Sequence, residues 1–187
     1  VAPGLIDSHV HFSASPETYG PVMLAHGIVL ARDMGADTDV ITAFRDQIAD
    51  GLMTGPDLLV TGAIIDGDPP IWPFSEPVET PDEARAAVRK LHEAGVDQIK
   101  LYSTLDPASY RAACDEATTL GLMPVGHVPA DVSLWEAADA GHRTVEHLTG
   151  VPDAVEIPGR KRDDRSLMER SINPWPRLAG ATPEAIA

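Results

Sequence analysis

Two histidines separated by one residue, within Asp7-Ser8-His9-Val10-His11-Phe12, give the sharpest chemical signal in the sequence. Residues two apart in a β-strand face the same side, so His9 and His11 project together. Two imidazoles at that spacing can hold one divalent cation. Because the pair stands at the carboxyl end of an apolar first strand and before a loop, we expect it to bind a metal.

Three more candidate ligands lie at the ends of later strands: Lys100, His127 and His147. A lysine inside an apolar strand is unusual, because burying an unpaired ammonium is costly. Lys100 either pairs with a buried carboxylate, reaches solvent, or loses its charge, for example by carbamylation into a carboxylate that bridges metals. If the strands are neighbours, their carboxyl ends meet, and we expect these side chains to converge with His9 and His11.

The remaining histidines serve as internal controls. We expect structural or exposed roles for them, because they lie on helix surfaces or at the amino ends of strands: His26, His92 and His142.

Weaker candidates surround the proposed ligands. Tyr102 points the same way as Lys100, and Trp72 lies in the proline-rich segment 66–80, so both are candidate substrate contacts. A packed tyrosine and a plain surface connection are the alternatives. Arg32 and Asp33 end the second strand, where they either orient the site or form a structural ion pair.

Apolar runs that alternate with helical patterns supply the elements that position these residues. The predicted strands cover residues 5–12, 28–34, 58–65, 98–102, 123–128 and 144–148. The best helix covers 80–95, with Thr80 and Glu83 as a capping box and Gly95 as its C-terminal stop; further helices lie near 40–51, 106–121 and 131–141. Strict alternation predicts an α/β fold with parallel strands. Six strand–helix units are enough for a doubly wound sheet, whereas an eight-stranded barrel needs two more. Composition does not choose between these two folds.

Composition narrows the class of protein. The 187 residues include 14 Lys+Arg against 29 Asp+Glu, a net charge of −15, and 43% are hydrophobic. Such a chain is globular rather than disordered. Its negative charge repels nucleic acid and anionic membranes, so neither is an expected partner. We expect a small-molecule substrate, and a homo-oligomer is also an option. One cysteine excludes an internal disulfide framework.

The ends of the sequence carry expectations of their own. The chain begins with Val1, so either a leader has been removed or a longer protein begins earlier; the cytoplasm is the first expectation for its location. We expect residues 1–150 to form the barrel-like or sheet-like unit and residues 151–187 an irregular or helical continuation.

An ordered set of short motifs resembles the amidohydrolase superfamily, with its imidazolonepropionase-like and prolidase-like branch the nearest. The motifs span residues 3–148: Pro3 to His11, Arg32-Asp33-Met34-Gly35, Gly55-Pro56, Thr61-Gly62, Gly95 to Lys100, Gly126-His127-Val128-Pro129 and Val145-Glu146-His147-Leu148. The resemblance implies a TIM-type (β/α)₈ barrel. Only about six βα units fit this chain, so strands seven and eight and the flanking β-sandwich of the family are expected to be missing.

The resemblance also implies roles. The ligands of the family's more buried metal correspond to His9 and His11. Its carbamylated lysine, which bridges two metals, corresponds to Lys100. The ligands of the second metal correspond to His127 and His147. Zinc is the first expectation, with manganese, cobalt or iron as substitutes and one or two ions bound. A metal-activated hydroxide would attack an amide-like C–N bond, in a dipeptide or a cyclic amide.

One departure from the family limits that expectation. The family's essential aspartate at the end of strand eight has no counterpart here, so no catalytic acid or base is identified. Two alternatives therefore stay open: a truncated, non-catalytic barrel that acts as a binding subunit, and a metal-free α/β enzyme whose histidines are acid–base groups.

Overall fold

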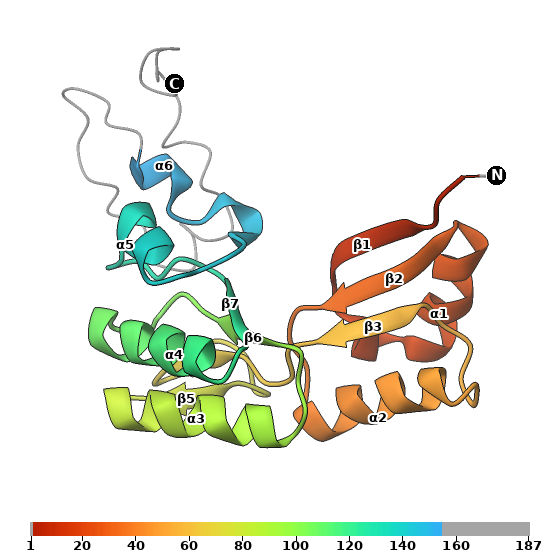
Figure 1. Ribbon diagram of the computed structural model, residues 1–187, viewed down its shortest axis with the longest axis horizontal. Coiled ribbons are helices and arrows are strands. Elements are labelled where there is room, and N and C mark those ends of the chain that lie inside the picture. Colours follow the sequence, from red (N-terminus) through yellow and green to blue (C-terminus); the bar gives the residue numbers. More distant parts are fainter. Residues whose placement is uncertain (1, 155–187) are drawn as a thin grey trace, which may run out of the picture.

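Parallel strands that alternate with helices build residues 2–154, the part of the chain that the computed structural model describes (Figure 1). Its strands are β1 (Leu5–Val10), β2 (Ile28–Asp33), β3 (Asp57–Val60), β4 (Ile65–Gly67), β5 (Glu76–Val78), β6 (Gln98–Leu101) and β7 (Met123–Gly126). Its α-helices are α1 (Pro16–Ala25), α2 (Thr38–Ala49), α3 (Pro81–Glu93), α4 (Pro107–Thr119), α5 (Leu134–Asp139) and α6 (Val151–Ala154), with short 3₁₀ turns η1 (Phe12–Ala14) and η2 (Glu146–Leu148). Within this part, no helix is both long and apolar enough to cross a bilayer.

The strands form two sheets with the orders β1-β2-β3 and β5-β4-β6-β7, and every pair within them is parallel. Hydrogen bonds join the sheets between β3 and the residue before β6: the Asp97 N–H donates to the Val60 carbonyl at 2.9 Å, and the Val60 N–H donates to the Asp97 carboxylate at 2.8 Å. Helices α3 and α4 lie side by side along the second sheet (Figure 1). The predicted α/β fold with parallel strands is confirmed, and the strands' carboxyl ends are available to form one rim.

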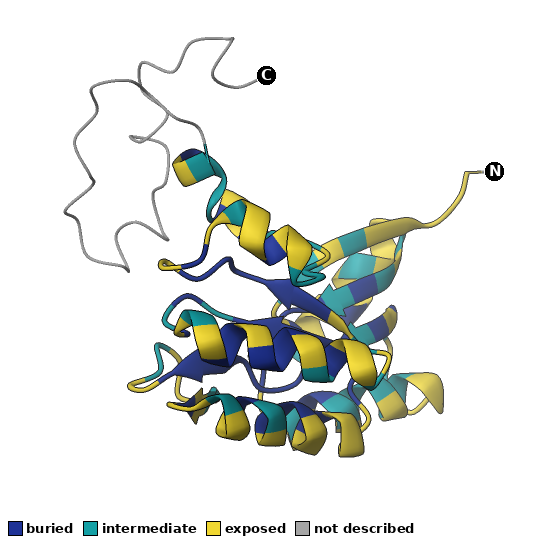
Figure 2. Cartoon of the chain, turned by 60° about the vertical axis from the view of Figure 1, so that its left-hand side comes forward, coloured by how far each residue is buried: buried dark blue, intermediate teal, exposed yellow. Residues whose placement is uncertain are grey.

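Helix α3 shows how the sequence sets these elements. The Thr80 hydroxyl accepts a hydrogen bond from the backbone N–H of Glu83, and the Glu83 carboxylate accepts one from the backbone N–H of Thr80, so the predicted capping box is present. The residues at helical spacing that point to the sheet are buried, while the opposite side is exposed (Figure 2). They form one apolar core with α4 and β6, because each element has a single apolar side that must be covered.

Two predicted strands differ in the structure. The strand over 58–65 is interrupted: β3 ends at Val60, Gly62 takes a φ of 65°, and β4 begins at Ile65. The strand over 144–148 is absent, because His147 and Leu148 take φ values of 55° and 58° and only Val145 forms an isolated bridge, to Gly126. A positive φ breaks the extended backbone that a strand needs.

Other boundaries shift as well. β1 ends at Val10 rather than Phe12, and the proline-rich segment contains β5, which the sequence did not predict. The continuation predicted over 151–187 lies outside the described residues beyond α6.

Leu91 tests how much the core of α3 contributes. Its side chain is 1% exposed within the main core, so Leu91→Ala should lower the free energy of unfolding by about 2–5 kcal/mol, through lost burial and a residual cavity. Chemical denaturation followed by circular dichroism measures this change. The matched control is Leu52→Ala, at a side chain that is 77% exposed, which should change it by less than about 0.5 kcal/mol. Equal effects at both positions would contradict this description of the core.

Candidate metal centre

Four histidines gather where strands of both sheets end. The ring centroids of His9 and His11 are 5.5 Å apart, those of His9 and His147 4.7 Å, and those of His127 and His147 5.2 Å. These residues come from β1, the start of η1, the end of β7 and η2, so His9 and His147 meet although one lies near the beginning and the other near the end of the described residues. His147 reaches the rim through the left-handed backbone of η2 and not, as predicted, from the end of a strand.

Lys100 lies in β6 and is 1% exposed. A Cβ at Gly126, on the neighbouring strand, would lie 2.8 Å from Lys100 Cδ and 2.3 Å from the Leu101 carbonyl oxygen, so only glycine fits beside this lysine. Burial lowers the pKa of the Lys100 ammonium to about 8; the negative charge of Glu146 opposes this shift and the positive charge of Arg32 adds to it. None of the ion pairs found among residues 2–154 involves Lys100.

His127 has one ring nitrogen engaged and one unpartnered. Nδ1 lies 2.8 Å from the hydroxyl oxygen of Ser103, and the residue is 3% exposed. No group in the described part of the chain forms a hydrogen bond with the buried Nε2. Burial, together with the positive charges of Lys100 and His147, lowers the pKa of His127 to about 2, so its imidazole is neutral. A buried polar atom without a partner requires an explanation, and a metal ion provides one.

His9 and His11 also use Nδ1 for a protein contact. His9 Nδ1 lies 2.6 Å from Oε2 of Glu146, and His11 Nδ1 donates to the Gly35 carbonyl at 3.1 Å. Metal-binding histidines usually donate their second ring nitrogen to a carboxylate or a carbonyl, which leaves the other lone pair for the ion. His9, His11 and His127 therefore each have Nε2 left for a ligand.

The imidazole nitrogens of the four rim histidines are donors that suit a transition metal, although these side chains do not surround a common point. Imidazole nitrogen suits zinc, copper, iron and nickel, and the unpartnered Nε2 of His127 is the atom that most needs such a partner. Within residues 2–154, however, no three histidine, cysteine or carboxylate side chains stand close enough together to hold an ion as they are placed.

Two carboxylates support the rim: Asp33, which the sequence offered as orienting the site or pairing with Arg32, and Glu146, for which the sequence predicted no role. Asp33, fully buried, accepts hydrogen bonds from the backbone of Phe12 at 2.7 Å and of Gly35 at 3.1 Å. Asp33 thus fixes Phe12, which follows His11, and Gly35, whose carbonyl His11 contacts. Burial raises the pKa of Asp33, and those two hydrogen bonds partly offset the rise. Glu146, which directly precedes His147, pairs with Arg32 at 2.6 Å, so the partner of Arg32 is not the adjacent Asp33.

The two candidate substrate contacts touch each other. Trp72 Nε1 donates to the Tyr102 hydroxyl at 3.0 Å, and the Tyr102 ring stacks on His127 with centroids 4.0 Å apart. Trp72, which is 45% exposed, also stacks on Phe74 with centroids 6.0 Å apart. The proline-rich segment is therefore a side wall of the rim, and these rings are its lining.

The three control histidines have other surroundings. His26 ends α1 with Nδ1 against the Val22 carbonyl, His92 is exposed on α3, and His142 Nδ1 lies 2.9 Å from the Tyr110 hydroxyl. No ring contact joins any of them to the four rim histidines among the described contacts.

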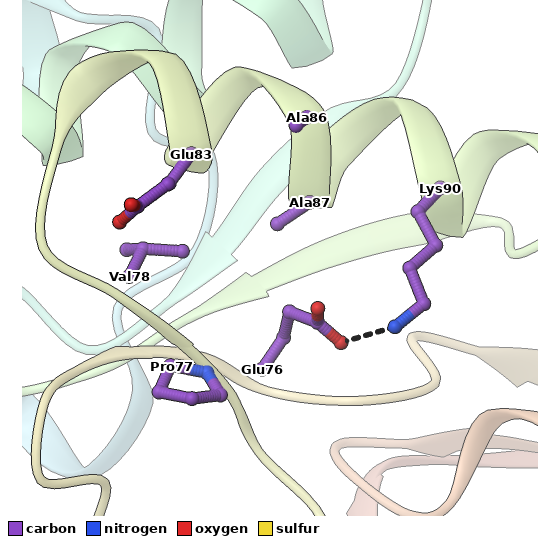
Figure 3. Close-up of a pocket in the computed structure, with 7 residues that line it drawn as sticks. All are labelled: Glu76, Pro77, Val78, Glu83, Ala86, Ala87 and Lys90. Atoms are coloured by element: carbon purple, nitrogen blue, oxygen red, sulfur yellow. Dashed lines mark hydrogen bonds and ion pairs between the residues drawn. The ribbon is translucent and has the colours of Figure 1, made fainter.

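A surface hollow lies elsewhere on the molecule. A cavity of about 190 Å³ lies between β5 and α3, where Lys90 and Glu76 form an ion pair of 2.6 Å. Figure 3 shows the residues that line it. None of the rim histidines lines it, so it is not part of the candidate centre.

Comparisons with known proteins can be set beside this geometry. No protein-family model and no curated protein matches the chain. Among solved structures, the bottromycin amidohydrolase is 26% identical with a TM-score of 0.74, over 98% of this chain and 37% of that one. A proposed prolidase from Bifidobacterium longum is 29% identical with a TM-score of 0.64, over 78% of this chain and 40% of that one.

The chain resembles the amidohydrolase superfamily in sequence and structure. A Xaa-Pro dipeptidase of the same fold is 24% identical with a TM-score of 0.59, over 78% of this chain and 48% of that one. The chain spans less than half the length of each of these three proteins. The resemblance inferred from the motifs is confirmed at the level of the superfamily.

Asp33→Asn tests the support of His11. An amide in place of the buried carboxylate keeps the volume but turns an NH₂ group toward one of the two backbone donors. The free energy of unfolding should fall by about 1–3 kcal/mol, the cost of an unmet buried hydrogen bond. Asp131→Asn, at an exposed residue, is the matched control and should change it by less than about 0.5 kcal/mol. Unchanged stability in Asp33→Asn, measured by urea denaturation, would contradict the supporting role of Asp33.

Proposed function

We propose that the protein is a metal-dependent hydrolase that cleaves an amide-like C–N bond in a small molecule, such as a dipeptide or a cyclic amide. One observation carries the proposal: the buried, unpartnered Nε2 of His127 lies within a group of four histidines at the carboxyl ends of parallel strands. In α/β folds this is the edge where ligands bind. The similar structures bear the names of a prolidase, an amidohydrolase and a Xaa-Pro dipeptidase, which favour C–N bond cleavage.

The strands that carry the rim are interpreted as an arc of a (β/α)₈ barrel. All their pairings are parallel, and hydrogen bonds between Val60 and Asp97 connect the two short sheets. In such barrels the active site lies at the carboxyl ends of the strands, where the histidines stand.

The proposed ligands are His9, His11, Lys100, His127 and His147. Zinc is the first choice for this nitrogen-rich set, with manganese, cobalt or iron as substitutes. When bound, such an ion activates water and polarises the carbonyl group under attack. We include carbamylation of Lys100 in the proposal, because this lysine is 1% exposed and takes part in none of the described ion pairs. Addition of carbon dioxide to its neutral amine, with loss of one proton to solvent, would give a carbamate whose oxygens would serve as ligands. No described side chain is assigned as the catalytic acid or base.

The aromatic wall is the proposed place for the substrate's apolar part. Tyr102 stacks directly on the proposed ligand His127, and Trp72 fixes the Tyr102 hydroxyl from the proline-rich loop. Burial raises the pKa of Tyr102, so its hydroxyl keeps its proton and can donate to a substrate oxygen. The wall thus supplies both apolar surface and one hydrogen-bond donor beside the metal ligands.

Zinc binding is the first test. Titration against a chromogenic chelator, with metal content measured by mass spectrometry, should give one or two tightly bound ions per chain. His127→Ala should weaken binding by at least about tenfold, because it removes a ligand. His92→Ala, which removes an exposed histidine from α3, is the control and should bind as the unaltered protein does. Absence of zinc binding, or an equal loss in both variants, would contradict the proposal.

Turnover separates the proposal from its alternatives. The zinc-loaded protein should release free amine from Xaa-Pro dipeptides or cyclic amides, and a chelator should abolish this release until zinc is restored. Activity that is insensitive to the chelator would favour metal-free acid–base histidines. Stoichiometric zinc without any turnover across both substrate classes would contradict catalysis.

Trp72→Phe tests the aromatic wall. This change keeps an aromatic ring but removes the N–H that holds Tyr102. We expect KM to rise by about twofold to tenfold, which corresponds to about 0.5–1.5 kcal/mol for one hydrogen bond, with zinc content unchanged. Trp135→Phe, at an exposed residue on α5, should leave KM unchanged and is the control. A KM that is equal in both variants would remove Trp72 from the substrate site.

A further inference from the structure

We propose that Glu146 is a positioning residue: its carboxylate fixes the His9 imidazole for the metal, and Arg32 and Thr144 hold that carboxylate in place. This inference rests on the proposed function. It assigns a role to three residues that neither bind the ion nor reach the substrate wall.

Both oxygens of Glu146 are fully used. Oε2 lies 2.6 Å from Nδ1 of His9, while Oε1 accepts from Nη2 of Arg32 at 2.6 Å and from the Thr144 hydroxyl at 2.9 Å. The Glu146 side chain is 9% exposed and that of Arg32 12%. With three donors around it, the carboxylate has one orientation, in which Oε2 faces His9.

Arg32 completes a network of hydrogen bonds around His9. Its Nε donates to the carbonyl oxygen of Ser8 at 2.7 Å, and its Nη1 lies 3.2 Å from the Thr144 hydroxyl. Ser8 immediately precedes His9, so Arg32 fixes the backbone on one side of the histidine while Glu146 fixes its ring. A histidine held at both points cannot swing out of the rim.

The same contacts set the spacing between two proposed ligands from opposite ends of the chain. Glu146 directly precedes His147, whose ring centroid lies 4.7 Å from that of His9. His147 keeps a left-handed backbone, which is unusual for a residue other than glycine. The anchored Glu146 side chain keeps the start of η2 against β1 and β2, and this holds His147 beside His9.

A purely structural ion pair would not need the third partner. Arg32 and Glu146 satisfy each other's charge, yet the second carboxylate oxygen is directed at a ring nitrogen. As an acceptor it fixes the proton on Nδ1 and leaves the lone pair on Nε2, the atom available to an ion. This specific consequence distinguishes a positioning role from simple stabilisation.

Glu146→Gln tests the inference with two measurements. Affinity for zinc should fall by about 10–100-fold, as found when the outer partner of a metal-binding histidine is removed. Histidine ¹H–¹⁵N spectra of the metal-free protein should show His9 losing its fixed Nδ1–H tautomer. Thr144→Val, which removes one of the three donors to the carboxylate and keeps its charge, should lower affinity less, and it serves if Glu146→Gln fails to fold.

The matched control is Glu116→Gln, which removes the charge from the Arg89–Glu116 pair of 2.8 Å between α3 and α4, where no rim histidine takes part. It should alter neither zinc affinity nor the His9 tautomer. If Glu146→Gln binds zinc as tightly as the unaltered protein and loses only stability, Glu146 is structural and the inference is overturned alone. If the unaltered protein binds no zinc, the proposed function and the inference fail together.

Discussion

The contact between Arg32 and Glu146 is the interaction on which the rim depends. It joins a side chain from β2 to one that follows β7, at an N–O distance of 2.6 Å and with both side chains mostly buried. Removing charges from water is costly, and a pair under these conditions is stable only if its remaining hydrogen-bonding atoms are satisfied. Ser8, Thr144 and His9 meet that requirement. These contacts offset the cost of burying the pair, and they fix the distance between His9 and His147, the first and last of the proposed ligands.

Electrostatics at the rim favour neutral imidazoles, the form that binds metals. Burial lowers the pKa of His127 to about 2 and that of Lys100 to about 8, and the positive charge of Lys100 adds to the shift at His127. Glu146 responds in the opposite sense. Burial alone raises its pKa, but hydrogen bonds from His9 and Thr144 and the charges of Arg32 and Lys100 outweigh it and bring the pKa to about 2. An ionised carboxylate therefore stands at the same rim as the neutral imidazole of His127.

Local patterns in the sequence predicted the elements well where the cause is local. Thr80 and Glu83 define a helix start by themselves, and the apolar spacing of α3 defines the face that is buried. The interrupted third strand was missed because Gly62 and its positive φ break the ladder without breaking the apolar run. The partner of His9 was missed for a different reason. Residue spacing says which way a side chain points, whereas the contact with Glu146 spans 137 positions and exists only after the strands have been arranged in space.

Another buried carboxylate, that of Asp66, links the proposed substrate wall to the proposed metal ligand His127. Asp66, fully buried at β4, accepts from the backbone of Ile71 at 3.2 Å and of Thr104 at 3.0 Å. Ile71 precedes Trp72 in the proline-rich segment, and Thr104 follows Ser103, whose hydroxyl contacts His127. The wall and the ligand therefore share one anchor, although their loops follow different strands. Proline limits the φ angles of the segment, so the segment has few alternative conformations. A single carboxylate, that of Asp66, is therefore sufficient to hold the loop against the rim.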